Sequence, residues 1–478
     1  MTITAELVFI VPEITLLVLA CIILIADTLH IEKHATLTYW LAQIALIVII
    51  FLILIDFPDE SKRLFFGNFV SDSMSGVLKV SICAITFIVF FYSYDYLKEH
   101  ELIKGEYFVL GLFAVLGMMV MVSANSLLTV YLGLELLSLS LYSMVAMHRE
   151  SQTASEAAMK YFVLGALASG ILLYGISILY GVSGTLELPA LSAYIEAQSG
   201  NNILLVFGLV FVIVGIAFKL GLVPFHMWLP DVYEGSPTSV TLFVSTAPKL
   251  AAFAMAIRLL VDGMGPMAGD WQDMLIILSV LSMAAGNIIA ISQTNIKRML
   301  AYSTIAHMGF FLLGIASATQ LGYAGSMFYM MIYALMIMGA FGMVILLGRK
   351  GYEADNLDDF KGLSERSPWF AFIMLILMFS MAGVPPFIGF WAKWFVLKEI
   401  IANGYVWLAT AAIILSVIGA YYYLRIVKLM YFDKPQNMTA IKASQEMRFI
   451  LSLNGLSLLF LGFMPGALMT LCIRAIGY

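Results

Sequence analysis

Apolar runs of about twenty residues follow one another along almost the whole chain, and they constrain its fold more than any other feature. A helix needs about twenty apolar residues to cross the hydrocarbon core of a bilayer. The chain is 62% hydrophobic and only 12% charged, whereas a soluble domain carries about 25% charged residues. So few polar groups could not cover the surface of a soluble protein. We therefore expect an all-α protein that crosses a membrane many times.

The apolar runs predict about 14 transmembrane helices joined by short loops, with no separate soluble domain. The first run begins near the N-terminus without a basic segment or a cleavage site, so we expect it to remain as a membrane helix. The predicted spans are residues 6–29, 36–57, 74–97, 107–123, 126–147, 154–181, 202–233, 238–260, 271–293, 297–318, 321–348, 368–402, 405–430 and 449–474.

Lysines and arginines are unevenly distributed over the predicted loops. With the N-terminus outside, the cytoplasmic loops hold fifteen of the 25 and the outer loops hold five. Cytoplasmic loops of membrane proteins carry an excess of Lys and Arg. We therefore expect a multi-pass membrane protein with both termini on the outer side, in the periplasm or its equivalent. The net charge of −5 is spread over short loops, and it provides no basic patch for nucleic acid.

The positions of the cysteines and the lack of catalytic motifs indicate no metal or cofactor in this chain. Cys21, Cys83 and Cys472 lie far apart inside apolar runs, without CxxC spacing or a histidine partner. We therefore predict no disulfide and no metal site. The sequence also lacks a nucleotide-binding loop and a nucleophile–base motif, so an enzyme with its own active site is the least favoured function.

Four charged residues lie deep in the predicted spans, although a charge near the bilayer centre costs at least about 2.5–3.5 kcal/mol. Glu135 in YLGLELLSLSLY is too short to reach water, and Lys249 in STAPKLAAF lies halfway along its span. Lys219 and Lys393 lie beside predicted helix breaks. Such residues are expected to pair with one another or to line a wet cavity.

Two other lysines lie nearer to the ends of their spans. A lysine within a turn of a helix end can extend its amine to the headgroups. We expect this of Lys79, which follows the polar run SDSMS. For Lys160, extension to the headgroups and a role as a proton relay both stay open.

Two predicted spans are too long for the membrane and contain a helix break. The span 202–233 has about 32 residues, which would give a helix of about 48 Å for a core of about 30 Å. Proline lacks an amide donor and clashes with the preceding turn, and the span 368–402 has the same plan. Broken backbone is tolerated in a membrane only inside protein or along a wet cavity. The residues at the breaks are Gly221 and Pro224 in the first span, and Gly383, Pro385 and Pro386 in the second.

The two breaks share a sequence pattern. Residues 221–225 read GLVPF and residues 383–387 read GVPPF, and a tryptophan follows each as Trp228 and Trp391. If helices 4–8 and helices 9–13 form two units, each break falls in the fourth helix of its unit. Units of five helices enter the membrane from opposite sides, so we predict an inverted repeat. The predicted domains are residues 1–106 with helices 1–3, residues 107–260 and 261–432 with the two repeats, and residues 433–478 with helix 14.

Four stretches of the chain resemble one known family. They are YLGLELLSLSLY around Glu135, FKLGLVPFHMWLPDVYEGSP, the STAPK proline–lysine pair, and GVPPFIGFWAKW. Together they resemble the antiporter-like membrane subunits of respiratory complex I, which are related to the Mrp-type sodium/proton antiporters. The resemblance covers most of the chain and is densest over residues 107–432. Its most specific part is HMWLPDVYEGSP at residues 226–237.

The resemblance implies a subunit that moves protons from the cytoplasm to the periplasm while quinone is reduced elsewhere in an NADH–quinone oxidoreductase. It implies that NADH, FMN, iron–sulfur clusters and quinone belong to other subunits, and that the neighbours are the K-type and M-type membrane subunits. Glu135 and Lys219 would be the acid and base of the input half, the first repeat. Lys249 would be the connector, and Lys393 the lysine of the output half, the second repeat.

Two other functions stay open beside this one. A subunit of an Mrp-type sodium/proton antiporter would share the same lysines, so the motifs alone do not separate it from a complex I subunit. A scaffold without ion conduction is disfavoured, because it has no reason to retain four buried charges.

The buried charges lead to two expectations about mechanism. Burial disfavours a charged amine and a nearby carboxylate restores it, so we expect Glu135 and Lys219 to form a switchable pair. The helix macrodipole favours a cation at the end of a half-helix, where Lys219 lies, and disfavours it early in a half-helix, where Lys393 lies. We therefore expect a higher proton affinity at Lys219 than at Lys393, which suits release of the proton on the outer side.

Two histidines in the spans are candidate relays, because an ordinary pKa near 6.5 suits proton transfer. His226 follows the first break, and His307 lies in AYSTIAHMGF. Hydrogen-bonded packing, the usual role of a lone intramembrane histidine, stays open for both.

Overall fold

The computed structural model describes residues 6–29, 35–198, 202–348, 352–435, 441 and 443–477. Within this part of the chain, 13 helices are long and apolar enough to cross a membrane. Each of the 14 predicted spans contains at least one helix. The span 368–402 does not count among the 13, because it consists of two helices of 15 residues. The prediction of an all-α polytopic membrane protein is confirmed.

The described helices and strands follow one another in a simple order, in which the η labels mark short 3-10 helices except for the π-helix η2. They are η1 (Leu7–Ile10), α2 (Val11–Leu29), α3 (Ala35–Ile55), β1 (Lys62–Leu64), β2 (Phe69–Ser71), α4 (Ser73–Glu99), α5 (Gly105–Val122), α6 (Leu127–Val145), α7 (Gln152–Ser183), α8 (Leu188–Ala197), α9 (Ile203–Leu220), α10 (Trp228–Gly235), α11 (Thr238–Ser245), α12 (Ala247–Ala256), η2 (Ile257–Gly263), η3 (Gly265–Met267), α13 (Ala268–Ser292), α14 (Ile296–Ala316), α15 (Gln320–Leu347), η4 (Leu357–Phe360), α16 (Leu363–Arg366), α17 (Pro368–Ala382), α18 (Ile388–Ala402), α19 (Val406–Phe432), α20 (Gln445–Phe463) and α21 (Pro465–Ile476).

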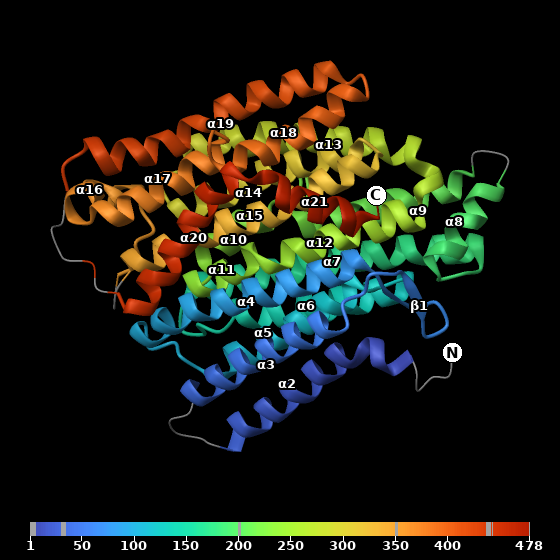
Figure 1. The fold of residues 1–478 in the computed structure, drawn as a ribbon, viewed down its shortest axis with the longest axis horizontal. Helices are drawn as coiled ribbons and strands as arrows, with labels where there is room; N and C mark the ends of the chain where they lie inside the picture. Colours follow the sequence, from blue (N-terminus) through green and yellow to red (C-terminus); the bar gives the residue numbers. More distant parts are fainter. Residues whose placement is uncertain are drawn as a thin grey trace.

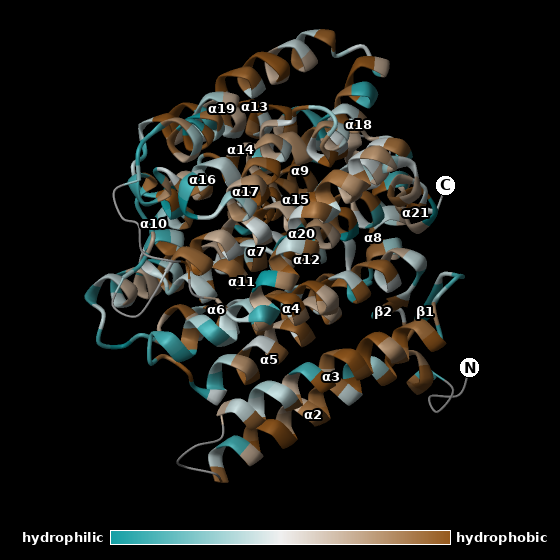
Figure 2. Ribbon diagram, turned by 60° about the vertical axis from the view of Figure 1, so that its left-hand side comes forward, coloured by the Kyte–Doolittle hydropathy of each residue, from teal (hydrophilic) through white to brown (hydrophobic). Residues whose placement is uncertain are grey.

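The long helices lie side by side, with α2 and α3 at one edge, α19 at the opposite edge, and α14 and α15 between them (Figure 1). The most apolar stretch of α14 is 94% buried, whereas that of α2 is only 22% buried. The core of the bundle therefore lies around α14, and α2 presents its side to the surroundings. Figure 2 shows hydrophobic residues along the lengths of α2 and α3 and hydrophilic residues gathered toward the ends of the bundle, as expected of helices whose sides face lipid.

A short hairpin and α8 lie at the end of the bundle where α2 begins and α21 ends (Figure 1). In the hairpin, Lys62 of β1 pairs with Ser71 of β2 in an antiparallel register. Neither element was apparent in the sequence, because strands of three residues and a helix of ten are too short to show a period among the apolar spans.

Both predicted helix breaks are present and have the same backbone geometry. Gly221 and Gly383 follow the last residues of α9 and α17 in the left-handed region, with φ of 81° and 85°. The amide of Gly221 donates to the carbonyls three and four residues before it, and so does the amide of Gly383. The peptide bonds before Pro224 and before Pro386 are both cis.

Two further spans are interrupted where the sequence analysis predicted continuous helices. In the span 238–260, α11 ends before Thr246, whose backbone is not helical, and α12 carries Pro248 in its first turn. In the span 449–474, α20 ends before Met464 and α21 begins with Pro465. Proline is well accommodated in a first turn but not inside a helix, so each proline marks the start of a new helix.

Candidate functional site

Lys219 lines a small cavity in the first half of the chain, and Ser169, which is bonded to Glu135, lines it too. The carboxylate of Glu135, in the middle of α6, accepts a hydrogen bond from Ser169 of α7. Lys219 ends α9 and is buried, and its Nζ donates to Ser138 Oγ at 3.2 Å. Ser138, Ser169 and Lys219 line one cavity of about 20 Å³, which is enough for one water molecule. The amine of Lys219 therefore borders a water-sized space that Glu135 reaches through Ser169. Both charged side chains bond to serines, and they form no direct ion pair.

Lys249 caps the end of the broken helix α9. Its Nζ donates to the carbonyl of Leu220 at 2.9 Å and reaches the carbonyl of Lys219 at 3.4 Å. The last carbonyls of a helix have no partner within the helix, and a cation is favourable there. The amine also lies 5.7 Å from the centre of the Trp228 ring. A side chain from α12 thus supplies the cap that the break in α9 requires.

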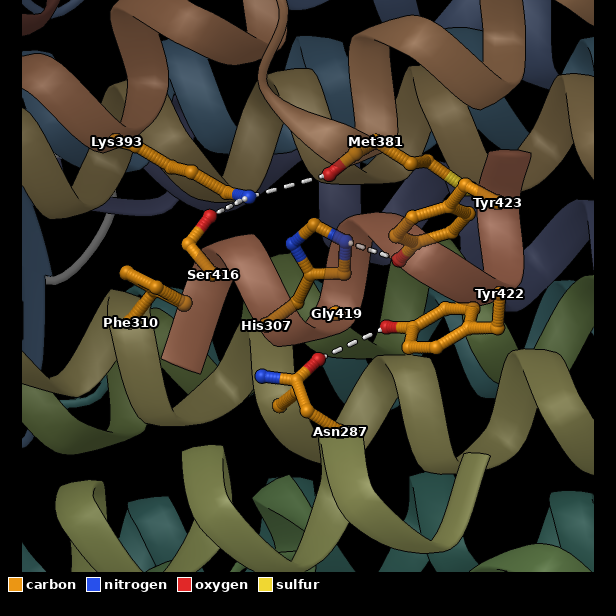
Figure 3. Close-up of a pocket in the computed structure, with 10 residues that line it drawn as sticks. Asn287, His307, Phe310, Met381, Lys393, Ser416, Gly419, Tyr422 and Tyr423 are labelled. Atoms are coloured by element: carbon orange, nitrogen blue, oxygen red, sulfur yellow. Dashed lines mark hydrogen bonds between the residues drawn. The ribbon is translucent and has the colours of Figure 1, made fainter. Parts of the chain in front are cut away.

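Lys393 occupies the corresponding place at the second break (Figure 3). Its Nζ donates to the carbonyls of Ala382 at 2.9 Å and Met381 at 3.3 Å, and to Ser416 Oγ at 2.8 Å. Although Lys393 is only the sixth residue of α18, its amine lies against the carbonyl end of α17. The expectation that the macrodipole of its own half-helix disfavours a cation is therefore wrong, because the side chain points back to the negative end of the preceding helix.

His307 links the second cavity to a group of hydroxyls. Its Nδ1 lies 2.7 Å from the hydroxyl of Tyr329, and its Nε2 lies 3.0 Å from that of Tyr423, which in turn bonds to Ser303. His307, Lys393, Ser416 and Tyr423 line a cavity of about 10 Å³ (Figure 3), which has room for about one water molecule.

His307 was predicted from the sequence as a candidate relay, but its polar neighbours were not. Serines and tyrosines inside apolar spans are common, and nothing in their spacing marks a site. One signal was available: Ser416, Gly419 and Tyr423 are spaced to share one face of α19, and all three line the cavity.

Two of the candidate relays lie away from both cavities. Lys160 is 43% exposed and forms ion pairs with Asp231 at 2.8 Å and Glu156 at 2.9 Å. His226 is half-buried between α9 and α10 and lines neither cavity.

The expectation that Lys79 extends to the headgroups is wrong. Its Nζ lies 2.6 Å from the carboxylate of Glu13, and the two side chains are only 6% and 4% exposed. Glu13 lies in the first turn of α2, and the sequence does not show which distant helix packs against α4. Among the described residues, no group of three or more His, Cys, Asp or Glu side chains could hold a metal ion.

The fold and the site define a polytopic membrane protein with amines buried at two helix breaks, an arrangement typical of ion-translocating proteins. Residues 124–419 match the family described as NADH:quinone oxidoreductase/Mrp antiporter, transmembrane. The chain belongs to this family, as the four sequence stretches predicted.

Curated relatives and solved structures extend the similarity beyond the matched segment. The chain is 57% identical over 470 residues to NADH-quinone oxidoreductase subunit N of Thioalkalivibrio sulfidiphilus, and the match covers 98% of both. It is 29% identical to a chain of respiratory complex I from Thermus thermophilus, with a TM-score of 0.83 and coverage of 96% and 98%. A chain of the Mrp complex from Dietzia shares the fold, with a TM-score of 0.84 and 18% identity over 100% of this chain and 97% of that one.

Within the family, two features of the sequence favour the N type of complex I subunit over the M type. They are Lys393 in place of a glutamate and the run YYYLRIVKLMYFDKP at residues 421–435. The N-type resemblance is confirmed by the full-length match to subunit N.

Proposed function

We propose that the chain is a proton-translocating, N-type membrane subunit of a bacterial NADH–quinone oxidoreductase. Protons would pass from the cytoplasm to the periplasm through Glu135, Lys219, Lys249 and Lys393. One observation carries this proposal: at each break, two backbone carbonyls hold a lysine amine that has no carboxylate in direct contact. Such an amine can gain or lose a proton without an ion pair being broken.

The proposed setting is the inner membrane, with both termini in the periplasm and the K-type and M-type subunits as neighbours. NADH, FMN, iron–sulfur clusters and quinone would be bound by other subunits. The 57% identity to subunit N supports this setting. The Mrp-type sodium/proton antiporter is less well supported, since 18% identity to the Mrp chain speaks only for a common fold.

In the first half, Glu135 and Lys219 would act as a pair that opens and closes. A charged Lys219 attracts the carboxylate, and a water in the cavity beside Ser138 and Ser169 would carry the proton between them. Loss of the proton from Lys219 removes the attraction. A charge on Lys249, whose amine contacts the carbonyl of Lys219, would favour that loss because like charges repel.

In the second half, we assign the first relay to Ser416. A neutral amine donates two hydrogen bonds and accepts one, and carbonyls only accept. Of the three groups bonded to Lys393, only Ser416 can receive its proton. The serine oxygen would take a proton from Nζ while its own hydroxyl proton passes to the water in the cavity that His307 and Tyr423 also line.

Proton pumping by the assembled complex tests the proposal. Glu135→Gln and Lys219→Met complexes, reconstituted in vesicles, are expected to acidify the lumen far more slowly than the unchanged complex. Lys104→Gln, an exposed change outside the cavities, is the control, and complex assembly is checked by native electrophoresis. Full pumping by both variants would refute the path. Pumping that requires sodium would favour the antiporter instead.

A further inference from the structure

A groove at one end of α5 and α6 lies apart from the proposed proton path. Its volume is about 450 Å³, and α2, α5 and α6 form its walls. Most of the side chains inside it are apolar, and two charged side chains lie at its rim. The apolar lining includes Leu24, Val109, Phe113, Ala146 and Met147, and the charged residues are Glu106 and Arg149.

The charged side chains lie at the ends of two membrane-spanning helices, and the apolar part of the groove extends along α5. Glu106 is the second residue of α5, and Arg149 follows the end of α6. Phe113 lies seven residues beyond Glu106, so the groove reaches about 10 Å along α5 from the rim. Glu106 and Arg149 are both exposed, and neither forms an ion pair within the described residues.

We propose that this groove binds a glycerophospholipid with a primary-amine headgroup. One acyl chain would fill the apolar part, Arg149 would bind the phosphate, and Glu106 would bind the ammonium group. Arginine matches phosphate geometry with two parallel hydrogen bonds, and charge-assisted hydrogen bonds are the strong ones. The pair of opposite charges at the rim therefore complements a zwitterionic headgroup.

The signs of the two charges at the rim argue against other headgroups. An anionic lipid would place its charge beside the carboxylate of Glu106, and a quaternary amine cannot donate a hydrogen bond to that carboxylate.

The lipid bound by the purified membrane complex tests this inference. The complex is exchanged into nanodiscs with equal amounts of phosphatidylethanolamine, phosphatidylcholine and phosphatidylglycerol, and the lipids retained after stepwise delipidation are measured by native mass spectrometry. The unchanged complex is expected to retain phosphatidylethanolamine in preference to the other two. Arg149→Gln and Glu106→Gln should each lower that retention about tenfold, as expected for the loss of a charge-assisted hydrogen bond.

A charge reversal gives a readout that a folding defect cannot imitate. Glu106→Lys makes the rim doubly positive, so the retained lipid should change from phosphatidylethanolamine to phosphatidylglycerol. Lys104 is exposed, comes directly before α5 and does not line the groove, so Lys104→Gln should leave the retained lipid unchanged. Equal retention of all three lipids by the unchanged complex, or no change in Arg149→Gln and Glu106→Gln, would overturn the inference. So would a photo-crosslinker at residue 113 that labels a neighbouring subunit and no lipid.

Discussion

The role assigned to Ser416 makes a sharp prediction about the rate of proton release from Lys393. Ser416→Ala removes one of three hydrogen bonds of the amine, at 2.8 Å, and leaves the two carbonyl contacts in place. A positioned group that takes up a proton speeds the transfer by about 10²- to 10⁴-fold. If the proton leaves Lys393 through this bond, Ser416→Ala should slow its release by up to that factor.

The assay separates proton movement from electron transfer. Vesicles with the Ser416→Ala complex are supplied with NADH and a quinone analogue, and lumen acidification is followed with a pH-sensitive dye while NADH consumption is recorded. Protons moved per NADH should fall. Ser416→Thr keeps a hydroxyl at the same place and should restore pumping. Thr410→Ala, an exposed change on the same helix, should have no effect.

The outcome that refutes this reasoning is an unchanged ratio of protons to NADH in Ser416→Ala. Such a result would mean that the proton leaves Lys393 through water alone, with the serine serving only as packing. A loss of pumping in Ser416→Thr as large as in Ser416→Ala would also refute it, because the hydroxyl would then be irrelevant.

Two further predictions concern stability and the second break. Burial would raise the pKa of Asp72, but Arg258, at 2.8 Å, holds it below its ordinary value. Asp72→Asn keeps the helix N-cap, and Arg258 keeps its second partner Asp262, so the substitution should lower the free energy of unfolding at pH 7 by about 1–3 kcal/mol. Since the pKa of the folded state is the lower one, this difference from the unchanged protein should disappear as the pH falls below about 4. Gly383→Ala and Gly404→Ala each place a side chain at positive φ, which costs about 1–2 kcal/mol. Only the first brings a Cβ within 3.1 Å of the Lys393 amine, so only Gly383→Ala should reduce pumping, and equal pumping by both would contradict this.

The sequence was sufficient for features that depend on one segment alone. Apolar length predicted the spans, and the prolines in two overlong spans predicted the breaks after Gly221 and Gly383. A proline also lies at the start of α12 and of α21, but their spans are short enough to cross the membrane unbroken. Length therefore gave no reason to expect those interruptions.

Contacts between distant segments could not be predicted in this way. Lys79 and Glu13 are 66 positions apart, and neither span shows in its own sequence that it carries the other's partner. The environment of the Lys393 amine could not be predicted for the same reason, because the macrodipole of its own helix α18 is only one part of it. The amine bonds to a carbonyl of α17 and to a hydroxyl of α19, and these contacts determine how strongly the positive charge is stabilised. The inverted repeat with the domain boundaries drawn from it stays a prediction.

The hydrogen-bond partners of the three lysines differ in whether they can accept a proton from the amine. Lys219 and Lys393 each contact a serine hydroxyl, which can donate or accept, so both charge states of the amine can be satisfied. Lys249 contacts two carbonyls and an aromatic ring, all of which favour the charged amine and none of which can pass a proton on. A proton on Lys249 must therefore leave through water that enters or through a movement of the side chain. Of the three exchanges this one depends most on a change of conformation, which would make Lys249 the gate between the two halves of the proposed path.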